Sequence, residues 1–195
     1  MRLLATLTLA SALSGPALCA TPAEVASQYA RIALAAYEDS LTTAEALQKA
    51  VAALIASPSD ATLQAARDSW RAARIPYQQT EVFRFGNPVV DDWEGRVNSW
   101  PLDEGLIDYV AADYIQNEDN ALAALNVIAT PAFTLSGAEI DASAITPALI
   151  RDTLHEADGI EANVASGYHA IEFLLWGQDL NGTGPGAGNR PFTDF

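Results

Sequence analysis

The sequence predicts an all-α fold, a helical bundle with one long irregular excursion. Apolar residues recur at helical spacing over most of the 195-residue chain, and helix-breaking residues gather between these segments. No segment shows the convincing alternation of apolar and polar residues that marks a strand. With 50% hydrophobic residues, the chain can bury a substantial core as a single domain.

Residues 1–20 have the features of a secretory signal peptide. Arg2 supplies a positive start, an apolar run follows, and Leu18-Cys19-Ala20 forms a plausible cleavage end. The run is too short for a membrane-spanning helix, and no later apolar run reaches the roughly 20 residues that a span requires. We therefore expect residues 21–195 to form the mature, exported domain.

The composition restricts the partners. The chain carries 10 basic and 25 acidic residues and a net charge of −15, which argues against nucleic acid and anionic membrane surfaces and is compatible with cations. Cleavage after Ala20 would remove Cys19, the only cysteine. A metal site in the mature chain would then use histidine, carboxylate and backbone oxygen, which suit iron, manganese, zinc or calcium better than copper(I).

The first two helices follow from their caps and their periodicity. Thr21-Pro22 predicts a helix start, and the helix should run to about Ala56, with a possible interruption at Thr42-Thr43. The segment Ser57-Pro58-Ser59-Asp60 ends this helix and caps a second one over about residues 60–84.

The second helix carries a polar and aromatic stripe on one face. Its members, spaced by four, three and four residues, are Trp70, Arg74, Tyr77 and Glu81. A stripe that only packs in a core would be aliphatic. We expect Arg74 and Glu81 either to form a buried ion pair that sets the helix register or to join a site with Glu81 as a ligand. Pro76 should kink this helix.

The remaining segments alternate between loops and shorter helices. Asp103 should cap a short helix, although its carboxylate could also join a site. The expected segments are a loop over 86–103, helices over 117–129, 146–157 and 160–176, a mixed stretch with a turn at Ser136-Gly137, and a flexible loop from Gly177 onward.

Two polar residues in the apolar final helix form the main candidate site. His169 and Glu172 stand three residues apart, so both side chains can reach one point. A buried carboxylate requires a partner, and a metal ion would serve both groups. Glu81 is the expected third ligand, with Asp103 or Glu104 behind it. One imidazole with carboxylates suits iron or manganese, and zinc less well.

Other interpretations of these side chains stay open. They could form a metal-free polar network in the bundle core, or they could line a ligand pocket or a partner surface. The residues in question are His169, Glu172, Arg74 and Glu81.

Hydrolytic chemistry has little support in the residues. The segment His155-Glu156-Ala157-Asp158-Gly159 has a glycine where a zinc-protease helix has its second histidine. The chain has no Gly-x-Ser-x-Gly segment and only two histidines. The glycines of residues 182–188 are not followed by the Lys-Ser/Thr pair of a phosphate-binding loop.

The residues around His169 resemble the signature of the imelysin-like family. The matching string contains Gly167-x-His169-x-x-Glu172 and continues to Asp179. Residues 70–85 and 186–191 match as well, so the resemblance covers nearly the whole mature chain.

The resemblance implies a fold of two related helical bundles, iron-linked expression and a place in the bacterial cell envelope. The family is related to iron-regulated protein A and to the peptidase-like domain of periplasmic iron-uptake proteins, and it carries a metallopeptidase (M75) designation. Because its members are usually about twice this length, we expect the chain to be the N-terminal bundle, truncated at its C-terminus.

These observations together predict an exported, periplasmic or envelope-associated protein that takes part in acquiring iron, or else manganese or zinc, without turnover. The expected partners are the metal ion and an envelope iron-uptake protein. A metallopeptidase of the imelysin type and a non-catalytic envelope binding module are the alternatives. The expected metal ligands are His169, Glu172 and Glu81, and the expected orienting residues are Arg74, Tyr77, Trp70, Asp103 and Gly167.

Overall fold

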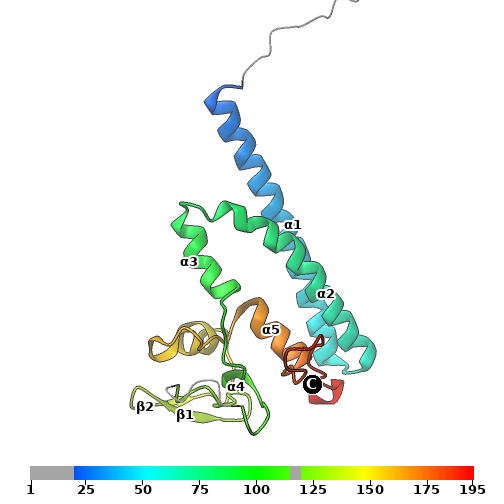
Figure 1. Ribbon diagram of the computed structural model, residues 1–195, viewed down its shortest axis with the longest axis vertical. Helices are drawn as coiled ribbons and strands as arrows, with labels where there is room; N and C mark the ends of the chain where they lie inside the picture. The colour runs from blue at the N-terminus through cyan, green and yellow to red at the C-terminus, as the bar shows by residue number, and fades with distance from the viewer. Residues whose placement is uncertain (1–19, 115–119) are drawn as a thin grey trace, which may run out of the picture.

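The computed structural model describes residues 20–114 and 120–195. Helices dominate it, which confirms the predicted helical class (Figure 1). The elements in chain order are α1 (Pro22–Ala56), α2 (Asp60–Thr80), η1 (Glu81–Phe83), α3 (Pro88–Val97), α4 (Glu104–Ile107), β1 (Ala132–Leu135), β2 (Ala138–Asp141), η2 (Leu149–Leu154), η3 (Ala157–Gly159), α5 (Gly167–Trp176) and η4 (Phe192–Asp194).

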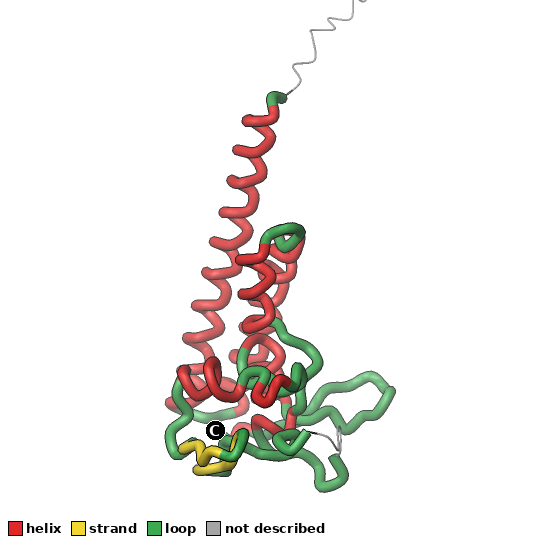
Figure 2. The backbone as a smooth tube through the Cα atoms, turned by 90° about the vertical axis from the view of Figure 1, so that its left-hand side faces the viewer, coloured by secondary structure: helices red, strands yellow, loops and turns green. Residues whose placement is uncertain are grey.

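Helix α1 begins where its cap predicts and continues without a break. The Thr21 hydroxyl and the Glu24 carboxylate form a reciprocal capping box. The interruption predicted at Thr42-Thr43 is wrong. The Thr42 hydroxyl donates to the carbonyl of Glu38 at 2.9 Å and the Thr43 hydroxyl to that of Asp39 at 3.0 Å, so both side chains are satisfied within the helix. The first third of α1 is exposed and projects beyond the other helices (Figure 2).

Helix α2 returns beside α1 after a three-residue connection, and the two pack along most of α2. It ends at Thr80 and tightens into η1, a little before the predicted boundary, and Pro76 lies inside it.

None of the helices in residues 20–114 and 120–195 is long and apolar enough to cross a lipid bilayer.

The segments between α2 and α5 differ most from the prediction. The predicted loop over 86–103 contains α3, which begins with Pro88 at its first position. The predicted helix over 117–129 lies partly outside the described residues, and residues 120–129 form turns. The helix predicted over 146–157 is present but shorter: residues 147–154 are helical, and most of them form the π-helical element η2.

The prediction that the chain contains no strands is also wrong. Strands β1 and β2 form an antiparallel hairpin in which Phe133 pairs with Ile140. Ser136 and Gly137 make its turn with φ values of 49° and 80°, at the position where the sequence indicates a turn. The strands are four residues long and mostly exposed, so they carry too little alternation to be detected.

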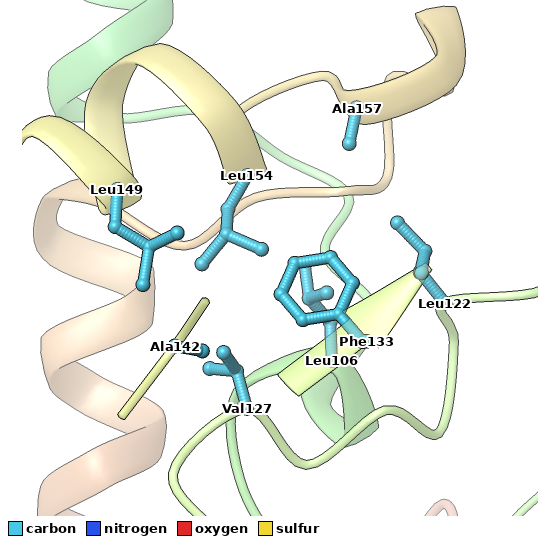
Figure 3. Close-up of a cluster of buried hydrophobic side chains, with 8 residues drawn as sticks. All are labelled: Leu106, Leu122, Val127, Phe133, Ala142, Leu149, Leu154 and Ala157. Atoms are coloured by element: carbon cyan, nitrogen blue, oxygen red, sulfur yellow. The ribbon is translucent and has the colours of Figure 1, made fainter. Parts of the chain in front are cut away.

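A hydrophobic cluster joins this hairpin to its neighbours (Figure 3) and forms the core of a second lobe, which lies at the lower left of Figure 1. It draws side chains from α4, the turns after it, the hairpin and η2. Its buried members are Leu106, Leu122, Val127, Phe133, Ala142, Leu149, Leu154 and Ala157.

A buried polar network closes the same lobe. The Asn120 side-chain amide donates to Asp103 at 2.5 Å and to Asn163 at 2.7 Å, and Asn163 donates to the carbonyl of Ala157 at 2.8 Å. The Asp103 side chain therefore serves this network and makes no capping hydrogen bond to α4. Because Asn163 is held here, the final helix begins at Gly167, and the helix predicted from residue 160 is wrong at its start.

We expect Asn163→Ala to lower the free energy of unfolding by about 1–3 kcal/mol, because it leaves buried polar groups of Asn120 and Ala157 without partners. Urea unfolding of the mature chain measures this loss. The exposed Asn189 provides the matched control, and Asn189→Ala should change stability by under about 0.5 kcal/mol. Equal effects of the two substitutions would contradict the network.

Gly167 allows α5 to begin against α3. Its φ is +86°, and a Cβ placed there would lie 2.4 Å from the carbonyl oxygen of Val97. Both the backbone angle and the contact exclude a side chain.

We expect Gly167→Ala to destabilise the fold by about 1–3 kcal/mol, whereas Gly95→Ala inside α3, where a Cβ meets open space, should be neutral or stabilising by up to about 1 kcal/mol. Thermal unfolding of the two variants compares them directly. A Gly167→Ala variant as stable as the parent chain would rule out this constraint.

Candidate functional site

The motif helix α5 carries the pair expected from its spacing. The Nδ1 atom of His169 lies 3.2 Å from Oε2 of Glu172. The His169 side chain is 18% exposed and that of Glu172 43% exposed, so the pair faces an opening in the surface and is not sealed in the core. The indole of Trp100 packs on the His169 ring, with centroids 5.0 Å apart, and restricts its orientation.

His169 and Glu172 line a cavity of about 320 Å³. Helices α2 and α5, the segment around α4, and the glycine-rich loop after α5 form its walls. The lining residues are Trp70, Arg71, Trp100, Leu102, Glu104, His169, Glu172, Phe173, Trp176, Gly177, Asp179, Gly186, Ala187 and Gly188.

Three carboxylates line this cavity, those of Glu104, Glu172 and Asp179. Burial raises the pKa of Glu104 above its ordinary value, and the negative charges of Asp179 and Glu172 raise it further. A cation in the cavity would relieve this repulsion. The one guanidinium in the wall, that of Arg71, is 2.9 Å from Asp68 and stacks on Trp176 at 5.0 Å.

The residue types that line the cavity suit a metal ion, but their spacing does not yet form a metal site. An imidazole with several carboxylates is suited to iron or manganese. Within residues 20–114 and 120–195, however, no group of three histidine, cysteine or acidic side chains is already spaced to hold a metal. A cation would therefore draw Glu104 or Asp179 toward the His169–Glu172 pair, or keep part of its water shell.

Glu81 stands apart from this cavity, whereas the sequence suggests it as the third ligand. It begins η1, about 16 Å along the helix axis from Trp70, the α2 residue in the cavity wall. Its charge acts instead on Tyr77, whose pKa is raised mainly by burial and further by Glu94 and Glu81.

Arg74 is held by aromatic rings and an amide. Its guanidinium lies 5.1 Å from the ring of Tyr168 and 5.6 Å from that of Tyr77, and it donates to Asn98. The buried ion pair expected between Arg74 and Glu81 is wrong: the two form no ion pair in the described structure. Arg74 positions α5 from behind and does not face the cavity.

The other predicted orienting residues support α5. Trp70 lines the cavity, donates its indole N–H to the carbonyl of Tyr168 at 2.9 Å, and packs edge-on against Trp176 at 5.4 Å. Tyr77 is buried behind Tyr168, with ring centroids 4.8 Å apart. These contacts fix the helix that carries the pair.

Sequence reasoning missed Trp100, Asp179 and Arg71 as cavity residues. Asp179 is part of the motif string, so its proximity to the pair was available as a signal. Trp100 and Arg71 come from distant segments, and only the packing of α5 against them reveals their role.

Comparison with known proteins agrees with this architecture. The sequence model of the imelysin family, which carries the designation peptidase M75, matches residues 33–195. A curated relative, iron-regulated protein A of Synechococcus elongatus, is 33% identical over 91 residues, which cover 46% of this chain. The matched segment spans 26% of that relative's length.

The family match includes every helix that forms the cavity and the whole motif string. The motif pair, its cavity and this match lead to one conclusion. The chain belongs to the imelysin family.

Proposed function

We propose that this chain is an exported protein of metal acquisition that binds a divalent cation, with iron as the first candidate. His169 and Glu172 would be ligands, and Glu104 and Asp179 would supply further oxygens. The observation that carries the proposal is that three carboxylates and one imidazole line a single cavity, with the pKa of Glu104 raised by burial and by its acidic neighbours.

The comparisons support the iron part of the proposal in general terms. The relative from Synechococcus elongatus is named for its regulation by iron, and the family match covers most of the chain. Export rests on the sequence of residues 1–20, which lie outside the described residues except for Ala20. The net negative charge of the chain would attract the cation.

The site chemistry suits loose, reversible binding. Glu172 is partly exposed, and the loop that carries Asp179 is exposed along most of its length. A cation could enter and leave without opening the core, and a transport or storage role needs such exchange. The tryptophans in the wall lower the local polarity and strengthen the attraction between carboxylates and cation.

We expect the mature chain to bind Mn²⁺, or Fe²⁺ without oxygen, and His169→Ala and Glu104→Gln each to weaken binding by about tenfold or more. Isothermal titration calorimetry measures both affinities. The matched control is Glu81→Gln, which removes an acid outside the cavity and should leave the affinity within about twofold. No binding by the parent chain, or a larger loss in Glu81→Gln than in Glu104→Gln, would overturn the assignment.

The peptidase designation of the family gives the second function to be tested. Incubation of the metal-loaded chain with unstructured polypeptides separates the two. Retained metal binding without cleavage supports a binding role. Metal-dependent cleavage that disappears in Glu172→Gln would make the chain an enzyme.

Without metal, Glu104 should destabilise the fold at neutral pH. A carboxyl whose folded-state pKa is raised contributes stability that is present below its unfolded pKa, about 4.3, and is lost as the pH rises through the folded value. We therefore expect Glu104→Gln to match the parent chain near pH 4 and to be more stable at pH 7, as measured by urea unfolding.

Saturating Mn²⁺ should reverse the order at pH 7, because only the parent chain gains the full binding energy. Glu139→Gln, an exposed change on β2, is the control and should show little pH dependence. Equal stability of parent and Glu104→Gln at pH 7 would contradict the repulsion.

A further inference from the structure

After α5 the chain makes a long loop that returns to the end of the same helix. We call residues 177–190 the strap. Its outgoing arm carries Asp179, and both arms contribute to the wall of the motif cavity, the returning arm through Gly186, Ala187 and Gly188. The position of the Asp179 carboxylate relative to the motif pair therefore depends on how the strap is held.

The two ends of the strap meet at the last turn of α5. The backbone N–H of Arg190 donates to the carbonyl of Trp176 at 2.8 Å. Gly188 lies against the same turn, where a Cβ would collide with the carbonyl oxygens of Trp176 and Gly177, so this arm can approach only without a side chain. Gly177 has a φ of +72° and turns the chain away from the helix. The strap is therefore a loop with a closed base.

The side chain of Arg67, on α2, contacts the chain on both sides of this base. Its Nε and Nη2 atoms donate to the carbonyl of Leu175, just before the strap, at 3.0 Å and 2.9 Å. Nη2 also donates to the carbonyl of Arg190, the last strap residue, at 3.0 Å. One guanidinium thus joins the two ends of the strap to each other and to the first half of α2 (Figure 1).

Arg67 acts through hydrogen bonds to carbonyls and not through an ion pair. Within residues 20–114 and 120–195 its guanidinium has no acidic partner at ion-pair distance. Burial lowers the pKa of Arg67, and the charge of Arg71 lowers it further. The carbonyls at the end of α5 supply the partial negative charge that favours a cation. The planar fork of a guanidinium suits two carbonyls at once, which makes lysine a poor replacement.

Within the strap, Asn181 orients the Asp179 carboxylate. Oδ1 of Asp179 accepts from the backbone N–H of Asn181 at 2.8 Å and from its side-chain amide at 2.6 Å. The same amide donates to the carbonyl of Ala187 at 3.2 Å, so it links the two arms beside Asp179. Because these bonds use Oδ1, a cation in the cavity would take Oδ2.

We propose that Arg67 is a positioning residue for the cation site: it closes the base of the strap and thereby holds Asp179 in the cavity wall, where its carboxylate can reach the cation. Arg67 does not line the motif cavity, so its effect passes through the strap. This role rests on the cation-binding function proposed above, whereas the closure of the strap does not.

The first test needs no metal. Arg67→Ala removes the three hydrogen bonds at the base, so we expect the Arg190 amide to exchange with solvent about tenfold or more faster than in the parent chain. Deuterium exchange followed by NMR measures this rate. The Ala142 amide, which donates to the carbonyl of Pro131 at 2.8 Å in the second lobe, should keep its rate. An unchanged Arg190 rate, or equal acceleration of both amides, would overturn the local closure.

The second test is a double-mutant cycle on Mn²⁺ affinity, measured by isothermal titration calorimetry. We expect Asp179→Asn to weaken binding about tenfold in the parent chain and less than about twofold in Arg67→Ala, because the carboxylate is no longer held at the site. Glu104→Gln, outside the strap, should weaken binding about tenfold in both backgrounds. A merely structural Arg67 would affect both carboxylates alike, and that outcome would overturn the proposal.

The matched control is Arg151→Ala, which removes an exposed arginine and should keep both the Arg190 exchange rate and the Mn²⁺ affinity. Circular dichroism verifies that each variant is folded, and Arg67→Gln, which keeps one donor group, replaces Arg67→Ala if the alanine variant does not fold.

The failures of the two proposals can be told apart. A parent chain that binds no Mn²⁺ would overturn the cation function and the positioning role with it. Mn²⁺ binding by the parent chain together with a full Asp179→Asn effect in Arg67→Ala would overturn the positioning role alone.

Discussion

The seating of α5 on the α1–α2 pair is the interaction on which the rest of the structure depends. This ten-residue helix contributes side chains to three of the hydrophobic clusters, so it joins the α1–α2 pair to the second lobe. Its first turn requires Gly167, because any side chain would collide with Val97. Its last turn is held by Arg67, whose guanidinium donates twice to the carbonyl of Leu175, at 3.0 Å and 2.9 Å.

Because α5 is fixed at both ends, its two faces can serve different purposes. One face presents His169 and Glu172 to a small cavity with acidic walls. The other face presents Ile171 and Leu174 to a mainly apolar groove along α1. Trp176 and Gly177 end the helix next to the loop that carries Asp179. A shift of α5 would therefore change both cavities at once.

The two cavities illustrate different costs of burial. In the motif cavity the unfavourable term is repulsion among carboxylates, which raises the pKa of Glu104 and which a cation relieves. In the groove between α1 and α5 the unfavourable term is the missing acceptor, among the described residues, for two buried groups of Arg190. The first cost arises from charge and the second from hydrogen-bond geometry.

The sequence by itself determined the features that depend on neighbours within a turn or two: the cap of α1, the helical class, and the contact between His169 and Glu172. It could not determine which distant carboxylate approaches that pair. Glu81 shares a helical stripe with Trp70, yet Glu104 lies at the cavity, because the burial of Leu106 and Ile107 brings α4 toward α5. The late start of α5 and the β-hairpin were decided in the same way, by Asn163 and Phe133 finding partners far along the chain. Helical periodicity is local, whereas the choice of partner depends on how the whole chain packs.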